Sequence, residues 1–172
     1  MYESLKRASP IRSLCLAGAA GALVFLMTSF SKVPIPLGYA HLGDAVIFLT
    51  ALYLPRRAAC GAAAVGSALA DLVGGFPVWV IPTFFIKCGM AYIVSRLANG
   101  KRRPCGLLVI VGFILSSLWL VVGYTAAGAL LYGSLSVGLS SAPGLLMEGA
   151  VNTAAALVVA SILPGRGNRN GC

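Results

Sequence analysis

The chain has 172 residues, of which 59% are hydrophobic and only 10% are charged. Soluble domains carry about 25% charged residues, so this chain lacks the polar surface that a protein needs in water, and we expect an integral membrane protein. Its net charge of +9 would suit nucleic-acid binding only on a soluble body with a basic face, and that class is therefore excluded.

Six apolar segments follow one another along the chain. They comprise residues 11–30, 42–54, 58–73, 78–97, 105–131 and 143–163. A helix that spans a membrane needs about 20 mainly apolar residues. The second and third segments are shorter, so we expect them to be tilted, sheltered by neighbours or partly re-entrant. The sequence thus predicts an all-α fold: a single transmembrane domain over residues 1–172 with about six spanning helices.

Basic residues alternate between the connections. They flank the start of the first segment, occupy the connections after the second and fourth segments, and follow the sixth: Lys6, Arg7, Arg12, Arg56, Arg57, Arg96, Lys101, Arg102, Arg103, Arg166 and Arg169. The other connections carry almost none, Lys32 being the exception. Cytoplasmic connections of membrane proteins are enriched in Lys and Arg, so both termini are predicted to be cytoplasmic.

Small residues recur at four-residue spacing in two segments. In the first segment they are Ala17, Gly18, Gly21 and Ala22, and a similar pattern runs from residue 61 to residue 70 in the third. Such faces let helices approach closely in lipid. We expect the third-segment face to pack inside the chain's own bundle. For the first segment, packing and the docking of a partner are both open.

Ionisable side chains lie in or beside these apolar segments. They are Asp44, Asp71, Lys87 and Glu148, with Asn152 one helical turn from Glu148. Burying a charge in hydrocarbon costs about 2.5–3.5 kcal/mol even on the lenient insertion scale, so such residues usually face the bundle interior and have partners. Asp44 opens the second segment at its outer end, and the others lie in the outer half or near the midplane. We predict that these groups line or support one pocket.

Aromatic residues occur at the same level as these charges, among them Tyr39 and Trp79, which are candidates for stacking on a ligand. A cavity lined by rings, hydrogen-bonding groups and a few charges suits a small, polar, aromatic ligand. Residues 31–43 form a Pro- and Gly-rich outer loop that we expect to cover the pocket as a lid. The loop carries the only histidine, His41, a residue that is more often structural than a ligand.

Two other functions stay open from the residues alone. Pairing of Lys87 with Asp71 or Glu148 would suit a structural subunit that binds nothing, and the buried carboxylates would also suit an intramembrane enzyme. The chain has no P-loop and no zinc-protease or serine-hydrolase motif, so we predict a protein that is not an enzyme and uses no cofactor. With one histidine, a metal site is not indicated. A small membrane protein that binds a ligand and has no ATP-binding motif would need an external energy source to move that ligand.

Three stretches carry a family resemblance: YAHLGDAVIFLTALYL at 39–54, GSALADLVGG at 66–75 and PTFFIKCGMAYIV at 82–94. They resemble the substrate-binding S components of energy-coupling factor (ECF) transporters, in the riboflavin, pyridoxine and hydroxymethylpyrimidine group. The specific points are Gly43 with Asp44, Asp71 within Ala-Asp-Leu, and Lys87 after Ile86.

The resemblance implies a multi-pass bundle in a bacterial plasma membrane that captures a vitamin beneath the loop between helices one and two. It also implies docking onto a transmembrane coupling subunit driven by two cytoplasmic ATPase subunits. The docking motif of the family is Ala-xxx-Ala in helix one, for which Ala17, Gly18, Gly21 and Ala22 are the nearest equivalents. A pyridoxine- or hydroxymethylpyrimidine-like substrate is favoured, and riboflavin stays open.

Overall fold

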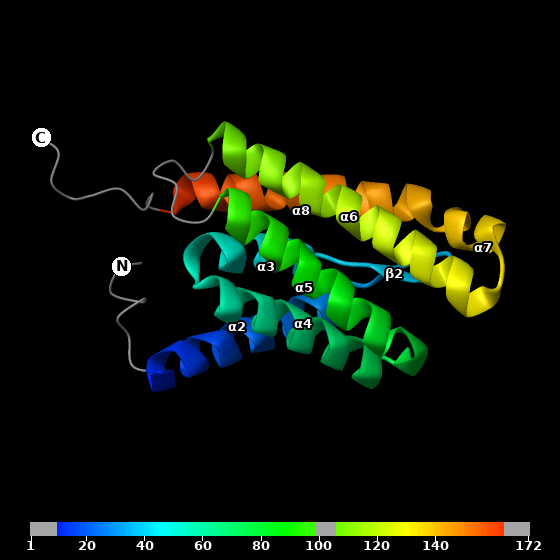
Figure 1. Cartoon of the computed structure of the whole chain (residues 1–172), viewed down its shortest axis with the longest axis horizontal. Helices are drawn as coiled ribbons and strands as arrows, with labels where there is room; N and C mark the ends of the chain where they lie inside the picture. Colours follow the sequence, from blue (N-terminus) through cyan, green and yellow to red (C-terminus); the bar gives the residue numbers. More distant parts are fainter. Residues whose placement is uncertain (1–9, 99–105, 164–172) are drawn as a thin grey trace, which may run out of the picture.

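All six predicted segments form helices in the computed structural model, which describes residues 10–98 and 106–163 (Figure 1). In chain order the elements are α2 (Pro10–Phe30), β1 (Val33–Ile35), β2 (Gly38–Ala40), α3 (Gly43–Tyr53), α4 (Arg56–Val73), the short 3-10 helix η1 (Pro77–Trp79), α5 (Val80–Leu97), α6 (Leu107–Tyr132), α7 (Leu135–Ser140) and α8 (Ala142–Ile162). The strands and α7 were not predicted. The all-α fold is confirmed.

Four helical stretches are long and apolar enough to cross a membrane, and they contain α2, α5, α6 and α8. Their outward side chains are largely apolar; Phe30, for example, is 85% exposed and Leu130 is 84% exposed. A protein in water rarely leaves so much contiguous apolar surface uncovered. The chain is therefore a multi-pass membrane protein.

The described basic residues at the helix ends gather at one end of the bundle, which does not test the side of the membrane they face. Arg12 lies near the start of α2, Arg56 and Arg57 start α4, and Arg96 ends α5, all at the same end of the bundle (Figure 1). The other cations used for that prediction lie outside the described residues: Lys6, Arg7, Lys101, Arg102, Arg103, Arg166 and Arg169. The cytoplasmic placement of both termini stays a prediction.

The short helix α3 is sheltered by its neighbours. Its 11 residues span about 16 Å, and it packs against α2, α4, α5 and α8. Phe48 of α3 is fully buried and stacks on Phe113 of α6 with ring centres 4.6 Å apart. An apolar helix too short to span a membrane is stable here because other helices surround it.

Helices α2 and α4 approach closely through small residues. A methyl group added at Gly66 of α4 would lie 2.4 Å from the carbonyl oxygen of Gly21 in α2, which leaves no room for a side chain. The expectation that the third-segment face packs inside the bundle is confirmed. On α2, Gly21 faces α4, whereas Gly18 and Ala22 are exposed.

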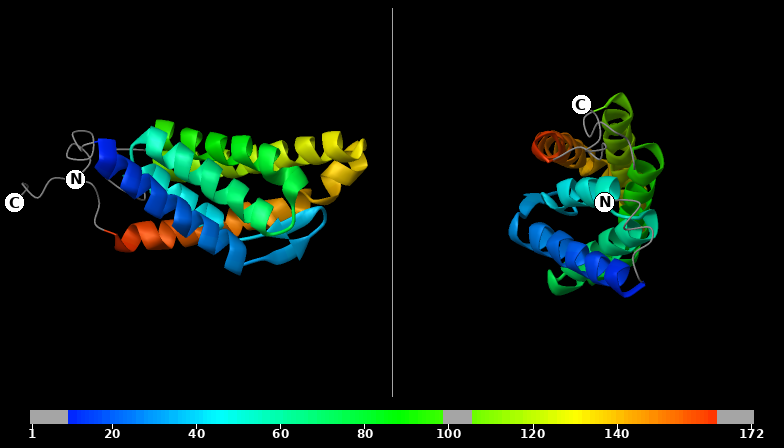
Figure 2. Two further views of the ribbon diagram at one scale, coloured as in Figure 1. Left: turned by 90° about the horizontal axis from the view of Figure 1, so that it is seen from below. Right: turned by 90° about the vertical axis from the view of Figure 1, so that its left-hand side faces the viewer.

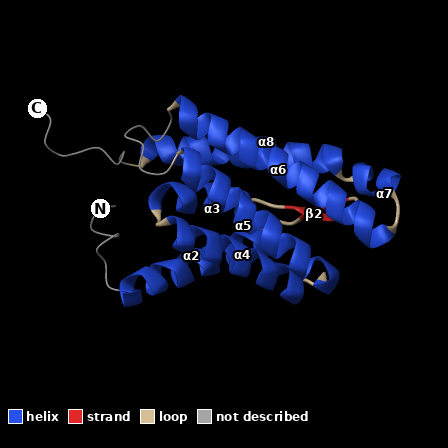
Figure 3. Cartoon of the chain, viewed as in Figure 1, coloured by secondary structure: helices blue, strands red, loops and turns tan. Residues whose placement is uncertain are grey.

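The connection between α2 and α3 folds into an antiparallel hairpin, in which Val33 pairs with Ala40 and Ile35 pairs with Gly38. Its two strands form a two-stranded sheet, and strands are coloured red in Figure 3. At the turn, Leu37 adopts φ 66°, a left-handed conformation that is uncommon for residues other than glycine. The hairpin lies toward the end of the bundle where α7 lies (Figure 2), so α3 begins inside the bundle and not at its end.

Candidate functional site

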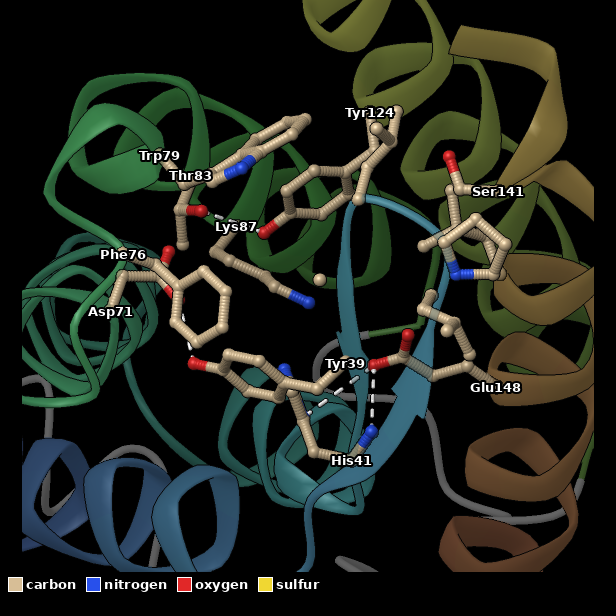
Figure 4. A pocket seen from close by; sticks show the side chains of 15 residues that line it. Tyr39, His41, Asp71, Phe76, Trp79, Thr83, Lys87, Tyr124, Ser141 and Glu148 are labelled. Carbon is tan, nitrogen blue, oxygen red and sulfur yellow. Dashed lines mark hydrogen bonds and ion pairs between the residues drawn. The ribbon is translucent and has the colours of Figure 1, made fainter. Parts of the chain in front are cut away.

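A cavity of about 50 Å³ lies beneath the hairpin, among α4, η1, α5, α6 and α8 (Figure 4). Its wall combines aromatic rings, polar groups and the hairpin turn: Ile35, Pro36, Leu37, Gly38, Tyr39, His41, Asp71, Phe76, Trp79, Thr83, Lys87, Tyr124, Ser141, Leu145 and Glu148. Of the seven predicted site residues, the cavity is lined by Tyr39, Asp71, Trp79, Lys87 and Glu148. Asp44 and Asn152 lie behind this wall.

Tyr39 ties the hairpin to α4. Its hydroxyl donates a hydrogen bond of 2.7 Å to Oδ1 of Asp71, and its ring lies 5.1 Å from that of Phe76. Burial, and next the neighbouring Asp71 carboxylate, raise the pKa of Tyr39 above its usual value. The phenol therefore stays neutral and donates, while Nζ of Lys32 covers the ring at 4.3 Å from its centre.

Lys87 and Asp44 form a buried ion pair. Nζ of Lys87 lies 2.5 Å from Oδ1 of Asp44, with 1% and 0% of the two side chains exposed. The pairings considered from the sequence, with Asp71 or Glu148, are therefore wrong. Lys87 is in the middle of α5, so its partner Asp44 lies at the same depth. The sequence had placed Asp44 at the outer end of its segment, which is less deep. The carboxylate also lies in the first turn of α3, where the helix dipole favours negative charge.

His41 and Glu148 meet at the base of the hairpin. The backbone N–H of His41 donates to Oε1 of Glu148 at 3.3 Å, and the same oxygen is 3.5 Å from Nδ1 of His41. Nδ1 itself accepts a hydrogen bond from the N–H of Gly43 at 3.1 Å. Burial lowers the pKa of His41 to about 3, so the imidazole is neutral near pH 7 and carries no charge into the cavity.

Asn152 holds the start of α3 in place. Its Oδ1 accepts the N–H of Ala45 at 2.8 Å, and its Nδ2 donates to the carbonyl of His41 at 2.7 Å. The residue before α3 provides no side-chain cap, and the first N–H groups of a helix need partners. Asn152 of α8 supplies one of these partners, so it is a positioning residue for the loop.

The wall of the cavity opposite His41 and Glu148 consists of residues from η1, α5 and α6 (Figure 4). The hydroxyls of Thr83 and Tyr124 lie 2.9 Å apart, and the rings of Trp79 and Tyr124 are 5.7 Å apart. The hairpin turn closes the top, because Ile35 packs on Gly144 of α8 and Leu37 packs on Gly128 of α6. The predicted lid, residues 31–43, includes these turn residues, but the sequence did not single them out as site residues because isolated apolar residues next to prolines carry no periodic signal.

One group of potential metal ligands occurs in the described part of the chain. Atoms of His41, Asp44 and Glu148 lie within 4.8 Å of one another, which the sequence spacing did not indicate. However, Lys87 is already bound to Asp44, and Gly43 donates to Nδ1 of His41. In this cluster, Oδ1 of Asp44, Oε1 of Glu148 and Nδ1 of His41 already have partners within the protein.

A membrane bundle with a polar and aromatic cavity under a hairpin defines a membrane-embedded binding protein. Residues 9–164 match the family described as ECF-type riboflavin transporter, S component, and the chain belongs to this family. The resemblance noted in the sequence is confirmed. The chain is thus a vitamin-binding subunit of a transporter, in a family whose members are not enzymes.

Two further similarities accompany this match. The chain is 34% identical to an uncharacterized protein of Pyrococcus woesei over 112 residues, which are 64% of this chain and 74% of that protein. The fold is also similar to a solved structure described as the S component of a bacterial ECF transporter, with a TM-score of 0.72 and 18% identity. That alignment covers 90% of this chain and 96% of the other.

Proposed function

We propose that the chain captures a small B-vitamin or vitamin precursor from outside the cell and presents it for ATP-driven uptake. A pyridoxine- or hydroxymethylpyrimidine-like molecule is the favoured substrate, and riboflavin is the larger alternative. The observation that carries this proposal is the cavity in which Tyr39, Phe76, Trp79 and Tyr124 surround a few hydrogen-bonding groups. Rings of this kind bind flat aromatic molecules, and the polar groups orient them.

The size of the cavity favours a small substrate and a moving lid. Pockets that hold small molecules usually enclose about 300–1,000 Å³, whereas this one encloses about 50 Å³. The hairpin must therefore withdraw for any vitamin to bind. A single-ring molecule needs less displacement of Leu37 and Tyr39 than the three fused rings of riboflavin. Residues 31–43 would thus act as the lid.

The partners in this proposal are a transmembrane coupling subunit and two cytoplasmic ATPase subunits in a bacterial plasma membrane. Of the predicted docking residues, Ala17 and Gly21 are partly buried, and Gly21 faces α4. Gly18 and Ala22 are exposed and one helical turn apart. They offer the coupling subunit a place for close helix approach, so the docking register would be Gly18 with Ala22.

The two tryptophans of the chain provide a matched test of this proposal. Trp79 lines the cavity, whereas Trp119 is 44% exposed and donates to the carbonyl of Ile86 on the outside of the bundle. The protein is purified gently, and the small molecules that it retains are identified by mass spectrometry. We expect a vitamin-like molecule in the wild type and in Trp119→Phe, and a strongly reduced amount in Trp79→Leu.

Binding is then measured directly with the Trp119→Phe variant, in which Trp79 is the sole tryptophan of the sequence. Pyridoxine, hydroxymethylpyrimidine and riboflavin are titrated, and the fluorescence of Trp79 is recorded. A ligand in the cavity should change this signal with saturation. The proposal fails if the wild type retains no vitamin-like molecule and no member of the panel binds.

A further inference from the structure

The cavity and the layer behind it contain more carboxylates than cations. Asp71 and Glu148 line the cavity, and Asp44 lies directly behind Lys87. Lys87 is the one cationic side chain that lines the cavity among the described residues. Because Nζ of Lys87 lies 2.5 Å from Oδ1 of Asp44, its charge is already paired and is not free for an anionic ligand.

The neighbouring groups supply no free positive charge to Asp71. Asp44 is the partner of Lys87, and Glu148 accepts the backbone N–H of His41. His41 is neutral, because its Nδ1 accepts the Gly43 N–H. The charge of Asp71 is then left without a counterion in the cavity.

Asp71 presents this charge to the cavity beside aromatic rings. The hydroxyl of Tyr39 donates a hydrogen bond of 2.7 Å to Oδ1 of Asp71. Oδ2 of Asp71 has no hydrogen-bond partner among the residues described. Phe76 follows on the same side of the cavity (Figure 4). Among the described residues no cation forms an ion pair with Asp71; Lys32 covers the ring of Tyr39 and does not line the cavity. A carboxylate that is 7% exposed is costly without a partner of opposite charge.

Resting on the proposed function, we propose that the captured nutrient carries a positively charged group that donates a hydrogen bond to Asp71. A protonated amine carried on a small heteroaromatic ring has this chemistry. The charged group would pair with Oδ2 of Asp71, and the faces of Phe76 and Trp79 attract cations as well. Analogues with a carboxylate at the same position are excluded, because they would meet Asp71 and find no free cation.

Three molecules with the same pyridine ring test the charge preference: pyridoxamine carries an ammonium group, pyridoxine a hydroxyl and 4-pyridoxate a carboxylate. The aminomethyl and hydroxymethyl forms of the pyrimidine give a second matched pair. We expect the ammonium form to bind about tenfold or more tightly than the hydroxyl form on at least one ring, since hydrogen bonds between charged groups are stronger than neutral ones. The carboxylate should bind more weakly than either.

The outcomes separate this inference from the proposed function. If riboflavin, the hydroxyl forms or the carboxylate bind as tightly as the ammonium forms, the chain is still a vitamin binder, but the inference is wrong. If no member of either series binds and riboflavin does not bind, both fail. Binding is read from the fluorescence of Trp79 in the Trp119→Phe background.

Two variants test the role of Asp71. Asp71→Asn removes the charge but keeps an oxygen that can accept from Tyr39, and it should lower the preference for ammonium over hydroxyl about tenfold. Tyr39→Phe removes the hydrogen bond to Asp71 but keeps the charge, so the preference should persist. An unchanged preference in Asp71→Asn overturns the assignment. If Asp71→Asn does not fold, as judged by its elution profile, the order of ligands in the wild type and in Tyr39→Phe decides.

Discussion

Replacing Lys87 with methionine should strongly destabilise the fold. Lys87 and Asp44 are 1% and 0% exposed, and they are each other's charge partner. Methionine fills a similar volume, but it leaves the Asp44 carboxylate without its cation, and Oδ2 of Asp44 already has no partner among the described residues. Removing one member of a buried ion pair costs about 3–5 kcal/mol. We expect Lys87→Met to lose about this much stability.

A second substitution should restore the loss if this pairing is correct. Replacing a whole buried pair with apolar residues is often neutral, or stabilising by about 1–4 kcal/mol. Lys87→Met combined with Asp44→Leu should therefore regain most of the lost stability, reduced by about 0.3–1 kcal/mol because Asp44 also interacts with the dipole of α3. The matched control is Lys87→Met with Asp71→Leu. It should not recover, because Asp71 is bound to Tyr39 and not to Lys87.

The assay is the apparent melting temperature in detergent, measured as the fraction of protein that elutes as a single species after heating. The wild type, the single variants and the two double variants form cycles that isolate each pairwise coupling. A large coupling is expected between positions 87 and 44, and a small one between positions 87 and 71. Recovery in the Asp71 double variant, or wild-type stability of Lys87→Met, would refute the reasoning.

Three further predictions concern packing, the lid and pH. Gly66→Ala should lower the melting temperature because the added methyl group meets the backbone of α2, while Gly61→Ala, which has open space around it, should not; equal effects would contradict the close approach of α2 and α4. Tyr39→Phe should speed the release of bound vitamin about tenfold through loss of the hydrogen bond to the Asp71 carboxylate, measured by rapid dilution, and unchanged release would argue against a role of this hydrogen bond in holding the lid closed. The pKa of His41 falls from 6.5 to about 3 on folding, so the unfolded chain takes up more protons and stability should fall as pH drops from 6.5 toward 3. His41→Gln should remove that part of the dependence, and a melting curve with the same pH profile as the wild type would contradict the assignment.

Much of the site composition could be predicted from the sequence. Asp71, Lys87 and Glu148 stand out because ionisable residues in apolar segments are costly and rarely face lipid. Tyr39 and Trp79 could be selected because they are aromatic residues at the same level of the predicted bundle as these ionisable residues. Their contacts could not be predicted. The partner of Lys87 is 43 residues away in the sequence, and the helical pattern of α5 gives no information about which helix lies opposite.

The hairpin shows a different kind of limit. Its strands have three residues each and include Pro34, so no alternating pattern is long enough to predict them. They form because Ile35 and Leu37 pack on α8 and α6, and Tyr39 binds Asp71. The role of Asn152 could not be predicted either, because it also depends on a tertiary contact. It acts on the start of α3, which is more than 100 residues away in the chain.

The sequence by itself determined that this is a multi-pass helical membrane protein with a few buried charges, and approximately where each helix lies. It could do so because the cost of placing a residue in hydrocarbon is a property of each segment alone. Only the tertiary structure decided that Lys87 meets Asp44, that Tyr39 meets Asp71 and that a hairpin covers the cavity between them. Those contacts depend on the relative depth and rotation of helices, which are set by packing between segments distant in the chain.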